Sequence, residues 1–225
     1  VRSFSSNDKP YPIPENLNIP EYWIRPQQIL SGTAGSHRFL WDMKYPPLDI
    51  PASYPIGANY RNTAPDQTAP WVLPGEYEAK LIVDGRTYTQ TFTIKMDPRV
   101  KISAADLQKQ YDIGLEAYAG RISCMNAQRK ITEFRNLIKA KLNGADAATT
   151  EKLNMLDKEA ASIMNGKPGS NDPSFGRLNG VFATVFNIVQ DAERPVTVQV
   201  KATHEDAKIQ LGKLQTQWLK LRSAL

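Results

Sequence analysis

The sequence has few of the residues from which many catalytic and metal sites are built. Its 225 residues include one cysteine, Cys124, and two histidines, His37 and His204. One cysteine excludes an internal disulfide and a cysteine-based zinc site. No apolar run reaches the about 18 residues that a membrane span needs. We therefore expect no metal, no cofactor and no membrane span.

Catalytic groupings are equally hard to assemble from this sequence. Cys124 falls inside a predicted helix with no histidine near it, which is typical of a small buried side chain. His204 lies on an apolar seam and is expected to be a half-buried structural residue. A glycosidase needs two carboxyl groups about 5 to 10 Å apart, and nothing in the spacing of the acidic residues forces a pair together. We expect no catalytic residue.

Proline is scarce in the second half of the chain. Of 16 prolines, 13 lie in residues 1–100, where they exclude long helices. The net charge also changes at this point. Residues 1–100 have 10 basic and 10 acidic side chains, whereas residues 101–225 have 18 basic and 13 acidic ones. The sequence therefore predicts two domains, 1–100 and 101–225, and places the excess charge in the second.

The clearest local pattern lies between Pro74 and Lys95. Two runs alternate with a period of two around Asp84-Gly85, and the second run carries a threonine at every other position. Asp-Gly suits a two-residue type I′ turn, because both central residues need positive φ. The pattern predicts a β-hairpin, with Asp84 and Gly85 in structural roles.

Further strands are expected in the first domain. His37–Lys44 alternates, with Trp41 on one side and Asp42 on the other, and weaker candidates lie at 22–30 and 1–5. Residues 45–70 contain six prolines and are expected to be loop. The best fit is a small antiparallel β-sandwich of immunoglobulin or fibronectin type. Asp97 is expected to have a structural role where the chain leaves the sheet, either by accepting from backbone amides or by pairing with Arg99.

After Arg99 the apolar period becomes 3.6, which predicts helices at about 103–143, 149–165, 174–192 and 203–223. Ser103 is expected to cap the first helix, whose two halves present large apolar residues on different faces. Pro195–Ala202 is expected to be extended. The predicted fold class is therefore α+β, with a β-sandwich followed by an antiparallel up-down helical bundle.

Two binding surfaces remain to be weighed. The basic residues of the second domain are interspersed with acids, so we expect a solvated helical surface and no nucleic acid. Four aromatic side chains lie in and beside the proline-rich loop: Tyr45, Tyr54, Tyr60 and Trp71. They are candidates for an aromatic platform that binds a glycan or a partner protein. Covering the end of the sandwich is the simpler role.

A set of ordered segments resembles a known family. These are Tyr22-Trp-Ile-Arg-Pro26, His37-Arg-Phe-Leu-Trp-Asp42, Pro74-Gly-Glu-Tyr77, Val83-Asp-Gly85 and the run from Phe92 to Arg99. Together they are similar to the C-terminal region of bacterial exported proteins that carry a sortilin/BNR-type β-propeller and are often labelled glycosyl hydrolases. The resemblance implies an immunoglobulin-like sandwich, a helical tail and a secreted, periplasmic or cell-surface location. It carries no catalytic residue onto this chain.

The leading hypothesis follows from this resemblance and from a first residue, Val1, that falls in an apparent strand. The chain is expected to be a non-catalytic accessory module of a larger exported protein, with a missing N-terminal β-propeller as its partner. A carbohydrate-binding module that uses the aromatic loop is the alternative. A glycoside hydrolase in its own right is the third reading.

Overall fold

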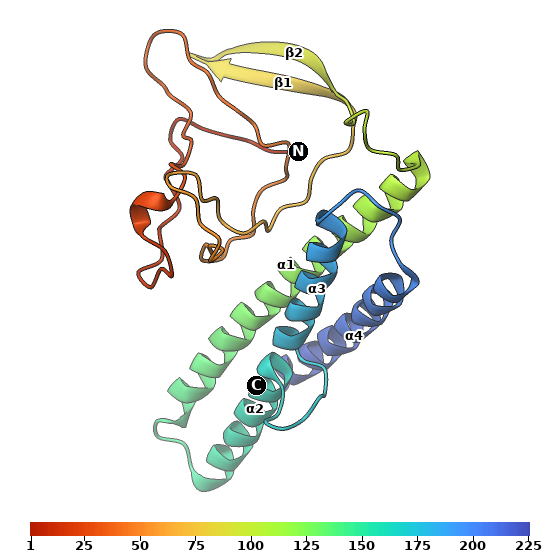
Figure 1. Ribbon diagram of the computed structural model, residues 1–225. Coiled ribbons are helices and arrows are strands. Elements are labelled where there is room, and N and C mark those ends of the chain that lie inside the picture. Colours follow the sequence, from red (N-terminus) through yellow and green to blue (C-terminus); the bar gives the residue numbers. More distant parts are fainter. The chain divides into compact units, whose positions relative to one another are not determined.

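The computed structural model describes residues 1–225 as two compact units, Val1–Pro74 and Gly75–Leu225 (Figure 1). The first unit is almost without regular structure. It contains one short 3-10 helix, Glu21–Trp23, and two isolated bridges, a parallel one between Ile24 and Thr63 and an antiparallel one between Lys44 and Trp71. Its small core consists of Ile19, Ile24 and Tyr54.

The predicted β-sandwich is wrong, and with it the immunoglobulin-like fold. The structure is mostly helical and has a single two-stranded sheet. Of residues 37–44, only Lys44 forms a bridge, and residues 22–30 contain part of the 3-10 helix and one bridge. Alternation of apolar and polar residues favours an extended chain, but a strand also needs a partner with free backbone N–H groups. Proline has no backbone N–H, so the proline-rich segments of this unit are poor partners for a strand.

The predicted hairpin is confirmed. Strand β1 (Gly75–Val83) pairs antiparallel with β2 (Arg86–Ile94), in a register that runs from Gly75 opposite Ile94 to Val83 opposite Arg86. The turn residues Asp84 and Gly85 have φ of 49° and 74°. Both values are positive, as a type I′ turn requires, and the turn therefore fixes the register of the whole ribbon.

Four helices make up the rest of the second unit: α1 (Ala104–Leu142), α2 (Ala147–Asn165), α3 (Phe175–Gln190) and α4 (Val198–Arg222). Each begins at a residue whose side chain accepts a hydrogen bond from a first-turn amide, and Ser103 does so for α1 as predicted. Thr197 caps α4. The fourth helix therefore starts before residue 203, and the prediction of an extended Pro195–Ala202 is wrong from Val198 onward.

The helices pack on one another around a shared apolar core. Phe175, Phe182 and Phe186 of α3 are fully buried there, and Trp218 of α4 meets Phe134 of α1 edge to face with ring centroids 5.2 Å apart. No helix is both long enough and apolar enough to cross a membrane.

The buried face of α1 differs from the face that the sequence predicts. One stripe is buried along the entire helix, with members three or four residues apart: Gln110, Gly114, Ala117, Gly120, Cys124, Ala127, Ile131, Phe134 and Ile138. From Gly114 to Cys124 this stripe is made of small residues, which let α3 approach closely. Leu107, Tyr111 and Leu115 lie beside the stripe and are half-buried. The two halves of α1 therefore bury the same face.

Candidate functional site

The β1–β2 hairpin has two chemically different faces. Side chains alternate across a strand, so the register assigns odd-numbered residues of β1 and even-numbered residues of β2 to one face. That face is apolar apart from Gln90 and Arg86, and its other side chains are Tyr77, Ala79, Leu81, Val83, Tyr88, Phe92 and Ile94. The opposite face carries two glutamates, one lysine, four threonines and Ile82.

The apolar face of the hairpin is open to solvent in the half next to the turn. Leu81 is 52% exposed and Tyr88 is 53% exposed. Tyr77 and Phe92 stack across the strands with ring centroids 5.9 Å apart, and neither strand packs on a helix. A two-stranded ribbon is at best marginally stable alone in water, and it gains stability when such a face is covered. This face is the strongest candidate interaction surface of the described chain.

The chain that follows the hairpin is held by a local ion pair. Asp97 Oδ1 accepts from Nε of Arg99 at 3.0 Å and Asp97 Oδ2 accepts from Nη2 at 2.6 Å. The side-chain hydrogen bond from Arg99 lowers the pKa of Asp97. The backbone N–H of Val100 donates to the Asp97 carbonyl at 3.0 Å, which closes a turn before α1. Asp97 thus pairs with the Arg99 side chain and also accepts from the Arg99 backbone N–H at 2.9 Å.

The candidate platform residues lie in the first unit, in different settings. Tyr54 is buried in the small core, so its ring is not available to a ligand. Tyr60 is exposed and meets Tyr22 edge to face, with centroids 6.2 Å apart. Tyr54 is therefore buried whereas Tyr60 is exposed. A sugar-binding platform made of all four rings is not possible, because the Tyr54 ring is covered.

The other two aromatic candidates lie on neighbouring segments. The backbone N–H of Tyr45 donates to the carbonyl of Pro70 at 3.0 Å, next to the bridge between Lys44 and Trp71. The Lys44 Nζ lies over the Trp71 ring, 4.1 Å from its centroid, so a cation covers one face of the indole. Burial lowers the pKa of Lys44.

Trp41 and Asp42 make local contacts in the same unit. The indole N–H of Trp41 donates to the Lys44 carbonyl at 3.0 Å, and Asp42 pairs with Arg2 at 2.8 Å. The Trp41 bond therefore closes a local turn, whereas the Asp42 pair joins two separate segments of the first unit. These contacts are compatible with the structural roles expected from the sequence.

A polar cluster around the buried side chain of His204 joins α1 to α4, and the sequence did not predict it as a group. His204 is 1% exposed, and its Nε2 lies 2.7 Å from Oε2 of Glu116. Lys208 Nζ donates to the same oxygen at 2.8 Å. These two hydrogen bonds lower the pKa of Glu116, and the bond from Lys208 has the larger effect. Only the place of His204 on the apolar seam of α4 hinted at this contact.

The same cluster contains a possible set of metal ligands, Glu116, His204 and Glu205, whose ligand atoms lie within 4.8 Å of one another. The ammonium group of Lys208 already binds the Glu116 carboxylate, and the same Nζ donates to Oε1 of Glu205 at 3.3 Å. The negative charge that would attract a divalent cation is thus neutralised by a lysine, which favours a structural link between helices.

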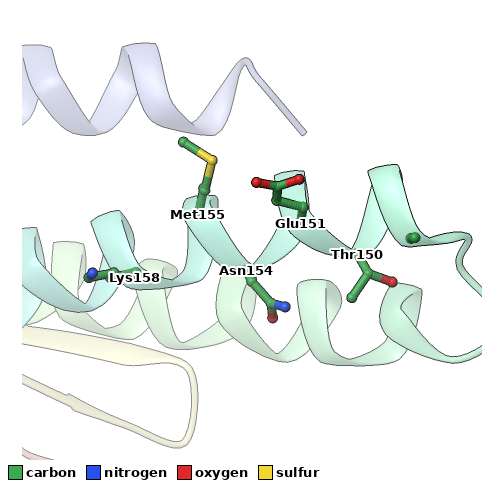
Figure 2. A pocket seen from close by; sticks show the side chains of 6 residues that line it. Thr150, Glu151, Asn154, Met155 and Lys158 are labelled. Carbon is green, nitrogen blue, oxygen red and sulfur yellow. The ribbon is translucent and has the colours of Figure 1, made fainter.

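Neither the lone thiol nor the hollow on α2 gathers reactive groups. Burial raises the pKa of Cys124 to about 12, so this thiol is protonated and inert at neutral pH. Figure 2 shows that side chains lining the hollow point in different directions, with Met155 and Glu151 on one side and Thr150 and Asn154 on the other. All of its lining residues belong to α2, and they do not converge on one point.

Comparison with protein-family models, with curated proteins and with solved structures gives no match for the chain. Nothing in these comparisons supports a relationship to sortilin, to BNR-repeat proteins or to glycosyl hydrolases. The assignment of function therefore rests on the site geometry alone.

Proposed function

We propose that the chain is a non-catalytic interaction module, in which a helical scaffold presents the β1–β2 hairpin and the apolar face of the hairpin packs on another protein. The observation that carries this proposal is the open apolar face with Leu81 and Tyr88 more than half exposed. Covering a large apolar side chain of this kind contributes on the order of 1 kcal/mol when half of it is already buried. Several such side chains together support a specific complex.

The chemistry of the hairpin indicates the kind of partner surface that fits. The centre of the face is aromatic and aliphatic, and residues of these types dominate binding at the centre of protein interfaces. Arg86 is the one charged residue of this face and lies at its turn end. The complementary surface is therefore an apolar patch of a folded protein with a carboxylate at its rim.

The titratable groups of the helical unit support a scaffold role. Arg135 of α1 and Asp157 of α2 form a bidentate pair, with Nε to Oδ1 at 2.7 Å and Nη2 to Oδ2 at 3.0 Å. Glu116, His204 and Lys208 link α1 to α4. These groups are engaged in holding helices to one another.

A pair of neighbouring residues allows a sharp test. Leu81 and Ile82 are both exposed aliphatic residues of β1, but Leu81 belongs to the apolar face and Ile82 to the polar face. A photoreactive amino acid placed at position 81 in the native host is expected to crosslink one defined protein, and the same group at position 82 is not. The purified partner must then bind the purified chain.

Two results would overturn the proposal. One is equal crosslinking from positions 81 and 82, which indicates random collision. The other is a purified partner that binds the Leu81→Asp variant as tightly as the wild type. Circular dichroism of the Leu81→Asp variant checks that the hairpin and helices remain folded.

A further inference from the structure

The outer edge of β2 lacks the features that usually protect the edge of a sheet. In a two-residue hairpin the residues that flank the turn form a hydrogen-bonded pair, and such pairs alternate along the ribbon. The backbone groups of Thr87, Thr89, Thr91 and Thr93 therefore point outward, away from β1. No proline, bulge or charged residue interrupts the strand between Arg86 and Lys95. Natural proteins guard exposed edges with such features.

The outer edge of β1 is different. Its outward-pointing backbone groups belong to residues 76, 78, 80 and 82, and the first three carry the charged side chains Glu76, Glu78 and Lys80. Charges on an edge strand oppose pairing with a further strand. The two edges of one hairpin are thus unequal, and the uncharged, threonine-rich edge of β2 is suited to strand addition.

We propose that two copies of the chain pair through β2, antiparallel, about a two-fold axis at Gln90. Gln90 is the central residue of β2, so this register gives the longest overlap of the two strands. It also keeps the two apolar faces on the same side, because residues of equal parity lie opposite each other. The result is a four-stranded sheet in the order β1-β2-β2-β1, and the interface is isologous.

The side chains that this register brings together are complementary. Tyr88 falls opposite Phe92 of the second copy, and Thr89 falls opposite Thr91. Aromatic pairs and threonine pairs across antiparallel strands each contribute favourably. Lys95 falls opposite Gly85 of the second copy, between Asp84 and Arg86, so charges contribute little at the ends of the interface and the aromatic and threonine pairs provide the complementarity.

The expected strength of the dimer follows from its size. Pairing along one strand buries less surface than a standard protein interface, so the dimer is weak and depends on concentration. It gains from a second effect, because a two-stranded ribbon is marginal whereas a wider sheet with one apolar face is stable. The pairing uses the edge of the hairpin and goes beyond the proposed function, which uses its face.

A single cysteine substitution in each copy tests both the contact and its register in the purified 225-residue chain. In Gln90→Cys the two sulfur atoms of the dimer meet on the two-fold axis, and oxidised glutathione is expected to give a disulfide-linked dimer. Ala79→Cys is the matched control, because Ala79 lies opposite Gln90 in the hairpin, on the same face and also exposed. The native Cys124 is buried and does not interfere.

Sedimentation velocity at protein concentrations from about 1 to about 500 µM measures the reversible dimerisation without a crosslink. The wild type is expected to shift from monomer to dimer, and Thr89→Pro, which removes an outward N–H, to weaken dimerisation at least tenfold. Lys80→Pro makes the same change on the β1 edge and is expected to leave dimerisation unchanged. A monomer at every concentration, or equal crosslinking of Ala79→Cys and Gln90→Cys, overturns the proposal. Neither outcome affects the test of the apolar face with a partner protein.

Discussion

Gly120 of α1 lies directly against the ring of Phe182 in α3. A Cβ atom added at Gly120 would lie 2.8 Å from two ring carbons of Phe182, closer than real Cβ contacts. Phe182 is fully buried among the helices, so its ring has no free space to move into. The absence of a side chain at position 120 therefore sets the separation of the two helices with the most extensive mutual contact.

Gly120→Ala is predicted to destabilise the fold although alanine is the better helix former. The clash is expected to lower the free energy of unfolding by about 1 to 3 kcal/mol, more than the gain in helix propensity. Gly212→Ala in α4 is the control, because a Cβ there meets nothing within 4 Å. It is expected to stabilise by about 0.5 to 1 kcal/mol. Urea denaturation measures both changes, and a stabilising Gly120→Ala would contradict this packing.

Asp157→Asn is predicted to destabilise the helical unit in a pH-dependent way. The Arg135 guanidinium hydrogen-bonds the Asp157 carboxylate and lowers its pKa below the ordinary value of 3.8. A depressed carboxyl pKa contributes stability above the unfolded-state pKa, and this contribution is lost as pH falls through the folded-state pKa. The variant is therefore expected to lose about 1 kcal/mol at neutral pH.

The same variant should match the wild type once the carboxylate is protonated in both states. Urea denaturation of the two proteins at neutral pH and at successive values below about pH 4 follows the loss. Glu159→Gln, which removes the same negative charge from an exposed residue of α2 outside this pair, controls for net charge. A constant difference between wild type and Asp157→Asn at every pH would show that the ion pair is not its cause.

Gly85→Val is predicted to disrupt the hairpin. Gly85 has φ of 74°, which a β-branched residue adopts only with strain, so the type I′ turn is expected to be lost along with the register. Asp84→Asn retains a residue that tolerates positive φ and should keep the turn. Amide hydrogen exchange of β1 and β2 distinguishes the two variants. Unchanged protection in Gly85→Val would refute the assigned turn geometry.

The sequence predicted what is encoded locally. Asp84-Gly85 and the flanking alternation specify the hairpin with no distant information, and Ser103 marks the start of α1 in the same way. The β-sandwich prediction failed because such local patterns carry no information about pairing. A strand at 37–44 would need a distant partner strand, and the structure contains only the β1–β2 sheet. Propensity and alternation describe one segment at a time, and pairing is a property of two.

The candidate sites show the same division. Large apolar residues suggested two faces for α1, whereas the buried stripe of its first half contains Gly114, Ala117 and Gly120, which carry little hydrophobic signal. The contact between Glu116 and His204 spans 88 positions, and the only local sign of it was the place of His204 on an apolar seam. The open apolar face of the hairpin was also not foreseen, because alternation reveals that a strand has an apolar side but not whether anything covers it.

The most direct test of the account is the affinity of the purified partner for two aspartate variants, measured by titration calorimetry. Leu81→Asp puts a charge on the apolar face of β1, and Ile82→Asp puts the same charge on the neighbouring residue of the polar face. Leu81→Asp is predicted to weaken binding at least tenfold and Ile82→Asp to change it less than twofold. Equal affinities for the two variants would contradict the assignment of this face as the interaction surface.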